Sequence, residues 1–217
     1  MPTSDSNQVP AILQLVGEPA PASVLDIGVG WGKYGMLFRT ALEHGYPDVS
    51  NRARWRVRID GVEPYPPYIG EIQRSVYNEI HLAPIQTLLP QLSTYDVIFM
   101  GDVIEHFPQA EGLALLNQLV DKARHRVVLS TPNGHYDQGS MLGNELERHQ
   151  SAWFPDSFQT FPHHEIYASR KSIIAVLSKN PIPQTGRRWK LATYRRQPLS
   201  AAIRAWVDYR QRRLKQR

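Results

Sequence analysis

Apolar residues along this chain fall into two kinds of pattern, short dense runs and longer stretches with helical spacing. Dense runs rich in Val, Ile and Leu are typical of strands in a parallel sheet, and apolar residues three or four positions apart are typical of helices. The dense runs predict strands at 23–27, 56–62, 79–83, 96–100 and 126–130. The spaced patterns predict helices at 8–16, 33–43, 68–77 and 113–123.

Strands and helices therefore alternate along most of the chain, which predicts an α/β fold with a parallel sheet and right-handed crossovers. Two further apolar runs, at 165–168 and 173–177, are separated only by a short turn, so we expect an antiparallel hairpin at the end of the chain's sheet. The expected sheet is doubly wound, mostly parallel and seven-stranded. The long segment 131–161 is irregular and carries aromatic residues, as is common in binding loops.

The chain has 217 residues, of which 41% are hydrophobic, enough for one domain with a full core. It has no apolar run of about 18 residues, so no membrane span is expected, and its start lacks the pattern of a secretory signal. The absence of cysteine excludes disulfides and thiolate metal sites, and it fits a cytoplasmic location.

Positive charge is concentrated at the C-terminus. Residues 187–217 hold eleven Lys and Arg and one acidic residue, a net charge of +10, whereas residues 1–186 hold 14 basic and 19 acidic residues, a net charge of −5. We therefore expect a domain at 1–186 and a basic, helical C-terminal extension at 187–217, with Trp206 on its apolar stripe. Such a helix binds an anionic membrane surface or RNA, or it docks on its own domain with its charges in water.

The first predicted strand leads into three glycines at alternate positions, Gly28, Gly30 and Gly32, ahead of a predicted helix. Glycines here let the backbone turn sharply and approach a ligand, which the first N–H groups of the helix then face. The spacing matches neither the G-x-G-x-x-G of dinucleotide-binding proteins nor the G-x-x-x-x-G-K-S/T of phosphate loops. A glycine-rich turn in some other α/β protein is the alternative.

Together with Asp26, this G-x-G-x-G turn resembles motif I of the class I S-adenosylmethionine-dependent methyltransferases. The terminal hairpin is also similar to the Rossmann-like fold of that family. The resemblance covers about residues 9–179. It implies S-adenosylmethionine as the cofactor, bound at Asp26, Gly28, Gly30 and Gly32.

The next two strand ends bear on the nucleoside part of that cofactor. The second strand ends in Glu63 and Pro64, and an acidic residue at this place can accept both ribose hydroxyls. After the third strand the family often has an aspartate facing the adenine, but this chain has Ile85 and Gln86 there. We therefore expect the adenine to rest on Ile85 and to bond with backbone or with Gln86.

The fourth predicted strand leads into residues 101–107, which resemble the D-V-L-E-H segment of methyltransferases acting on small molecules and quinone precursors. This implies that Asp102 lies near the methionine part of the cofactor or near the substrate. In a helical turn, Asp102, Glu105 and His106 share one face. They then form an oriented base at His106, bind a divalent metal ion, or cap the helix and hold the loop.

Residues 130–134 are similar to the S-x-P-N-G segment of the same subgroup, and the following insert resembles the segment that subgroup places over its substrate. Asn133, Tyr136 and Trp153 are therefore the candidate substrate contacts, and His149 is a second candidate base. Packing of the loop for stability is the alternative for each of them.

These segments together predict a methyltransferase that O-methylates a small molecule, with His106, His149 and Asp102 as catalytic residues. The alternatives are an RNA or protein methyltransferase that uses the basic extension, and a non-catalytic S-adenosylmethionine-binding protein. Against methylation of nucleic-acid bases, the fourth strand ends in GDVIEHF and not in an N/D-P-P-Y/F segment. We expect a cytoplasmic protein, peripheral to the membrane if the extension binds lipid.

Overall fold

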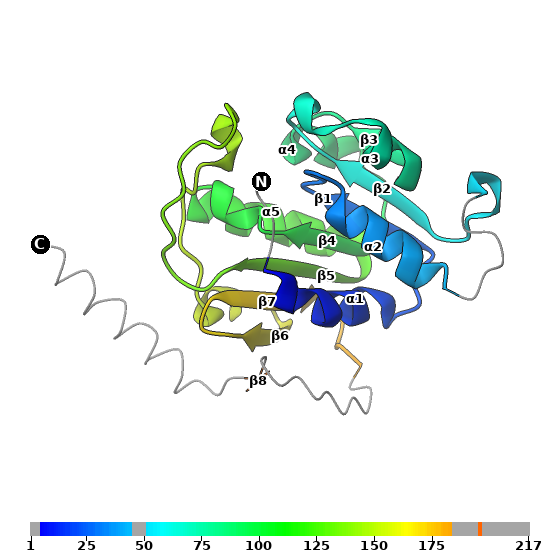
Figure 1. Cartoon of the computed structure of the whole chain (residues 1–217). Helices are drawn as coiled ribbons and strands as arrows, with labels where there is room; N and C mark the ends of the chain where they lie inside the picture. Colours follow the sequence, from blue (N-terminus) through cyan, green and yellow to red (C-terminus); the bar gives the residue numbers. More distant parts are fainter. Residues whose placement is uncertain (1–4, 45–50, 184–194, 197–217) are drawn as a thin grey trace, which may run out of the picture.

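A computed structural model describes residues 5–44, 51–183 and 195–196 of the chain. Its sheet has the strand order β3-β2-β1-β4-β5-β7-β6-β8 (Figure 1). The strands are β1 Ser23–Ile27, β2 Arg58–Val62, β3 Glu79–His81, β4 Tyr95–Gly101, β5 Ala123–Pro132, β6 His163–Ala168, β7 Ser172–Ser178 and β8 Arg195–Arg196. The α-helices are α1 Val9–Gly17, α2 Lys33–Leu42, α3 Glu71–Val76, α4 Ile85–Leu88 and α5 Gln109–Lys122.

The first five strands are parallel to one another, whereas β7 pairs antiparallel with β5, β6 with β7, and β8 with β6. The predicted mostly parallel, seven-stranded sheet with a terminal hairpin is therefore confirmed, and the two-residue strand β8 extends it. Because β8 lies in the segment predicted to be helical, that prediction is wrong for Arg195 and Arg196. The rest of the predicted helix, including Trp206, lies outside the described residues.

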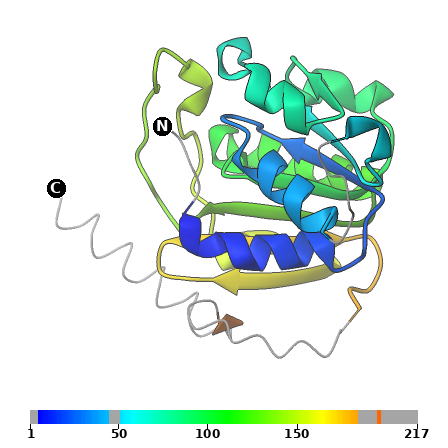
Figure 2. The same cartoon turned by 45° about the vertical axis from the view of Figure 1, so that its right-hand side comes forward.

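Helices cover both faces of the sheet, and the two faces carry separate apolar clusters. Successive side chains of a strand point to opposite faces. In β4, Val97 and Phe99 therefore join the cluster of α1 and α2, whereas Ile98 and Met100 join the cluster of α4 and α5. Figures 1 and 2 show α1 and α2 lying along one face of the sheet. Among the described helices, none combines the length and apolar character that crossing a membrane requires.

Two predicted helices differ from the structure by more than one residue at an end. The helix predicted at 68–77 is a 3-10 turn at Pro66–Tyr68 followed by α3, and Gly70 separates the two. Helix α5 begins at Gln109, before the predicted start at residue 113. The prediction missed its first turn because that turn lacks the apolar spacing of the rest of the helix. A side chain at Gly112 in that turn would place its Cβ 2.8 Å from the ring of Trp153.

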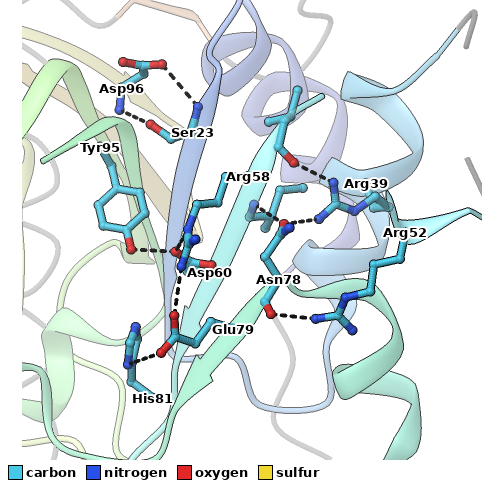
Figure 3. Close-up of polar contacts among 12 residues, drawn as sticks. Ser23, Arg39, Arg52, Arg58, Asp60, Asn78, Glu79, His81, Tyr95 and Asp96 are labelled. Carbon is cyan, nitrogen blue, oxygen red and sulfur yellow. Dashed lines mark hydrogen bonds and ion pairs between the residues drawn. The ribbon is translucent and has the colours of Figure 1, made fainter. Parts of the chain in front are cut away.

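A buried polar network fixes α2 beside β2, on the side of the sheet where β2 begins (Figure 3). The Arg39 guanidinium donates to the carbonyls of Val57 and Val76 and to Oδ1 of Asn78, at 2.7, 3.1 and 2.8 Å. The guanidinium also lies 3.6 Å from the ring centre of Trp55. Since α2 starts at the glycine turn, this network holds the turn in place from the far end of the helix.

Candidate active site

A cavity of about 2190 Å³ opens where the parallel strands end. Its walls come from the segments after each of the strands β1 to β5, from the turn between β6 and β7, and from residues near the start of the chain. The carboxyl ends of parallel strands are the usual ligand crevice of an open α/β sheet. The volume exceeds the range of about 300–1,000 Å³ for small-molecule sites, so the cavity has room for two ligands.

The glycine turn after β1 forms one wall of this cavity. Gly28, Gly30 and Gly32 all have positive φ angles, of 84°, 50° and 80°, which favour glycine. A Cβ at Gly30 would meet nothing within 4 Å and would occupy open cavity space, whereas a Cβ at Gly28 would lie 2.3 Å from Val103. Gly32 does not line the cavity but forms the N-cap of α2. Glycine is therefore required at the three positions for different reasons. Gly30 leaves space for a ligand, Gly28 allows close packing against Val103, and Gly32 allows the entry into α2.

Glu63 links the glycine turn to the end of β2. Its carboxylate accepts a hydrogen bond from the backbone N–H of Gly30 at 2.8 Å and another from that of Tyr65 at 2.9 Å. Burial raises the pKa of Glu63, although these two hydrogen bonds lower it in part. Each carboxylate oxygen keeps a further acceptor site. The side chain lines the cavity.

Asp26 does not line the cavity, so its predicted role in direct cofactor binding is corrected. Its side chain is 1% exposed and accepts a hydrogen bond from the hydroxyl of Tyr77. Burial, offset in part by this bond, raises the pKa of Asp26 to about 7. The alternation of side chains along β1 turns Asp26 into the layer beneath α2, where it supports the turn from behind.

Pro64, Ile85 and Gln86 line the same cavity as Glu63. Ile85 is buried at the start of α4, and Gln86 is exposed beside it. The apolar wall and the neighbouring amide expected for the adenine are thus both present at this side of the cavity, and the contact itself stays a prediction.

Asp102 follows β4 with a φ angle of 51°. Its N–H donates to the carbonyl of Ser130 and its carboxylate accepts from the Ser130 hydroxyl, at 2.9 and 3.2 Å. The helical turn expected here is a 3-10 turn limited to Ile104–His106, so Asp102 does not share a helical face with Glu105 and His106. Asp102 lines the cavity from the strand end, and its place near the methionine part of the cofactor or the substrate stays a prediction.

The Glu105 carboxyl is 2% exposed and accepts a hydrogen bond from the Thr131 hydroxyl at 3.0 Å. Burial and then the charge of Asp102 raise its pKa well above the usual range. Its backbone carbonyl accepts from the N–H groups of Gln150 and Ser151. Glu105 therefore ties the insert to the end of β4.

His106 and His149 lie side by side in the cavity wall, with ring centres 5.0 Å apart. Nδ1 of His149 lies 2.8 Å from the carbonyl of Tyr136, and Nδ1 of His106 lies 3.3 Å from the carbonyl of Arg148. A carbonyl accepts only, so Nδ1 carries the proton and Nε2 the lone pair in each ring. Burial lowers the pKa of both histidines.

Glu105, His106 and His149 each offer a ligand atom, and these atoms lie within 4.8 Å of one another. The metal-binding alternative from the sequence named Asp102, Glu105 and His106, whereas the structure groups His149 with Glu105 and His106 in place of Asp102. A carboxylate with two imidazoles suits several divalent transition metals.

Of the three candidate substrate contacts, Asn133 and Tyr136 line the cavity. Asn133 donates from Nδ2 to the carbonyl of Ser169 at 2.7 Å, and Tyr136 is 62% exposed. Trp153 is 0% exposed and stacks on Phe158 in the core, so its predicted role as a pocket wall is wrong.

Gln8 and Lys33 are among the polar groups at the cavity that sequence reasoning missed. Lys33 is the first residue of α2, directly after the glycines, and this position was the signal that could have identified it. Gln8 precedes α1 in a stretch without any motif, and only the fold brings it to the cavity.

Comparison with solved structures shows the same fold in several proteins. The N-terminal domain of EvdMO1, crystallised in the presence of SAH and D-fucose, is 16% identical over 82% of this chain and 85% of that chain, with a TM-score of 0.57. Cofactor-bound Rv0187 from MTB is 17% identical over 82% and 83%, with a TM-score of 0.53. The methyltransferase domain of bacterial CtHen1 is 18% identical over 79% and 96%, with a TM-score of 0.52.

No curated protein matches the chain. The family model described as "Methyltransferase domain" matches residues 6–178, which include the glycine turn, Glu63, both histidines and the terminal hairpin. The chain therefore belongs to this methyltransferase domain family.

Proposed function

We propose that the protein transfers a methyl group from S-adenosylmethionine to a hydroxyl group of a small molecule. The observation that carries this proposal is that two candidate sites, one at Gly30 and Glu63 and one at the two histidines, line the same cavity. Gly30 and Glu63 meet at 2.8 Å on one wall, and His106 and His149 lie on another wall of the same space. A nucleoside site and a basic site that share a cavity suit a transfer between two bound molecules.

The cofactor lies along the glycine turn in this proposal. The Glu63 carboxylate accepts the two ribose hydroxyls, and Gly30 leaves space for the backbone to approach the ligand. Pro64, Ile85 and Gln86 surround the adenine, and Asp102 lies toward the methionine part. The negative charge of Asp102 favours the positively charged sulfonium.

S-adenosylmethionine, when bound, supplies an electrophilic methyl group on sulfur. Held by Gly30, Glu63 and Asp102, it would give this methyl group to the acceptor oxygen and keep the electron pair of the broken bond on its sulfur. The hydroxyl proton passes to Nε2 of His149 or His106, whose tautomer is set by the carbonyl at Nδ1. Because burial lowers the pKa of each ring, it stays neutral and able to accept the proton near pH 7.

The test is methyl transfer to a panel of hydroxylated small molecules, followed as formation of S-adenosylhomocysteine. We expect the rate to fall as the pH drops below the lowered histidine pKa, since a protonated ring cannot accept a proton. His149→Ala or His106→Ala should reduce turnover by about 10²–10⁴-fold, the usual contribution of a general base. Full turnover in both variants would contradict the base assignment.

A bound divalent cation is a second candidate for activating the acceptor, favoured by the grouping of Glu105, His106 and His149. The donor set fits such an ion, since Glu105 is buried with a raised pKa and a cation would stabilise its charged form. These three residues would hold the ion, which would polarise the acceptor hydroxyl. Turnover that is lost in a chelator and restored by a metal ion favours this candidate over the base.

The subgroup resemblance of residues 101–107 and 130–134 supports a small-molecule acceptor. The basic extension at 187–217 supports the alternatives, which are an RNA or protein acceptor and a peripheral location at an anionic membrane. We place the small molecule first because both histidines line the same cavity as Gly30 and Glu63. A non-catalytic role would require an S-adenosylmethionine complex that never turns over with any acceptor class.

A further inference from the structure

Two cations in the turn between β6 and β7 have no part in the function described above. Arg170 and Lys171 line the cavity, and both residues are exposed. Because β7 pairs antiparallel with β5, Ser172 at the start of β7 lies opposite Pro132 at the end of β5. The turn therefore lies at the same end of the sheet as the carboxyl ends of the parallel strands (Figure 1).

Hydrogen bonds hold this turn against the end of β5. Asn133 donates from its backbone N–H to the carbonyl of Lys171 at 2.9 Å, and from Nδ2 to the carbonyl of Ser169 at 2.7 Å. Within the turn, Oγ of Ser169 accepts from the N–H groups of Lys171 and Ser172 at 3.2 and 3.1 Å. The backbone that carries the two cations is thus fixed beside the cavity, so a ligand has to order only their side chains.

The two cations differ from the nearby acidic groups in having no partner on the protein. Among the residues that the structure describes, no side chain pairs with Arg170 or Lys171. The carboxylates that line the cavity from the insert each contact a group of the protein, Asp137 with His135, Glu145 with Arg148 and Glu147 with the Tyr68 hydroxyl. The donors of both cations are therefore available to a ligand in the cavity.

The strand order separates this turn from the proposed cofactor position. Glu63, Gly30 and Asp102 follow β2, β1 and β4, and these strands are neighbours in the sheet. Because the order continues β4-β5-β7-β6, the rest of the cavity extends past the end of β5 to the β6–β7 turn. The cations therefore lie on the side of the cavity that is left for the methyl acceptor.

We propose that Arg170 and Lys171 bind an anionic group of the methyl acceptor, a carboxylate or a phosphate. A guanidinium can donate to two oxygens of such a group at once, and an ammonium adds a second positive charge beside it. The inference rests on the proposed function and specifies its substrate class, a small molecule that carries a hydroxyl group and an anionic group. Arg170 and Lys171 select the acceptor in this proposal and take no part in the transfer of the methyl group.

The experiment compares matched compounds, 3-hydroxybenzoate with 3-hydroxybenzamide and glucose 6-phosphate with glucose. Calorimetry of the full chain with S-adenosylhomocysteine present measures binding, and methyl transfer from S-adenosylmethionine measures kcat and KM. We expect the anionic member of at least one pair to bind more tightly, and the pair shows whether a carboxylate or a phosphate is preferred. Arg170→Met and Lys171→Met should each weaken its binding about tenfold, the lower end for a hydrogen bond to a charged group, because both residues are exposed. KM should rise with kcat unchanged, and Arg170→Lys should keep most of the affinity.

Lys179→Met is the matched control, because this exposed lysine pairs with Asp121 away from the cavity. Retained binding of S-adenosylhomocysteine shows that a variant is folded with an intact cofactor site. The inference is overturned if the unchanged protein prefers neither anionic compound, or if the variants weaken the anionic and neutral members equally. If an anionic compound binds through Arg170 and Lys171 but no compound is methylated, the proposed reaction fails and the anion site stands.

Discussion

At the scale of single residues, the proposed nucleoside site rests on one contact, between the carboxylate of Glu63 and the backbone of Gly30, which has no side chain. Glu63→Ala should weaken binding of S-adenosylhomocysteine by about 1–3 kcal/mol, because charge-assisted hydrogen bonds to the ribose are lost. Gly30→Val should abolish binding, since its side chain would fill the cavity and its φ of 50° disfavours a branched residue.

Calorimetry on both variants is the measurement, and Glu71→Ala is the control because it removes an exposed carboxylate on α3 outside the cavity. Unchanged affinity in both Glu63→Ala and Gly30→Val would place the cofactor elsewhere in the molecule.

Asp26 carries a prediction about stability, because it is a buried carboxyl whose pKa is raised to about 7. The folded state binds this proton more tightly than the unfolded state, so the stabilisation is full at low pH and is lost as the pH rises from about 4 to about 7. Asp26→Asn keeps an acceptor for the Tyr77 hydroxyl and cannot ionise.

The Asn variant should therefore be more stable than the unchanged protein at pH 8, by about 1 kcal/mol or more, since each unit of pKa shift corresponds to about 1.4 kcal/mol. The advantage should shrink toward pH 4. Denaturant unfolding at several pH values measures the difference, and an advantage that does not vary with pH would show that Asp26 does not titrate as described.

At the scale of elements, the sequence predicted most strands and the strand-end residues, because dense apolar runs and glycine spacing are local signals. Side-chain direction was not predictable in the same way. Asp26 and Trp153 belong to segments that reach the site, yet packing turns Asp26 beneath α2 and Trp153 onto Phe158. Gln8 reaches the cavity only because α1 packs beside α2. The sequence around Gln8 contains no pattern that predicts this packing.

The position of helix α2 depends on a network of hydrogen bonds, and Arg39 is at the centre of that network. Arg39→Met removes a side chain that is 4% exposed and leaves the buried carboxylate of Glu43 without its ion pair at 3.3 Å. Loss of one partner of such a pair costs about 3–5 kcal/mol. Urea unfolding should show a loss of this size in Arg39→Met and less than about 1 kcal/mol in the exposed pair variant Lys179→Met. Equal stabilities of the two variants would mean that α2 is held by apolar contacts alone.

At the scale of the whole molecule, charge and site are separated along the chain. Among the residues that the structure describes, those that line the cavity lie between Asp5 and Ser172, whereas the net charge of +10 lies in residues 187–217. This separation indicates that cofactor binding and any attraction to an anionic surface are independent properties.

Removal of residues 187–217 tests that independence. Affinity for S-adenosylhomocysteine should stay within a few-fold, while association with vesicles of anionic lipid should fall and, in the full chain, should weaken with salt, because screening shortens to about 8 Å at physiological ionic strength. Vesicles of neutral lipid are the control, and RNA is measured in parallel as the other polyanion. If the truncated protein bound both polyanions as well as the full chain does, the extension would have no binding role and its charges would only face water. An unfolded truncated protein would instead make the extension part of the core. Because the extension includes β8, which pairs with β6, circular dichroism should establish that the truncated protein is folded before any binding is measured.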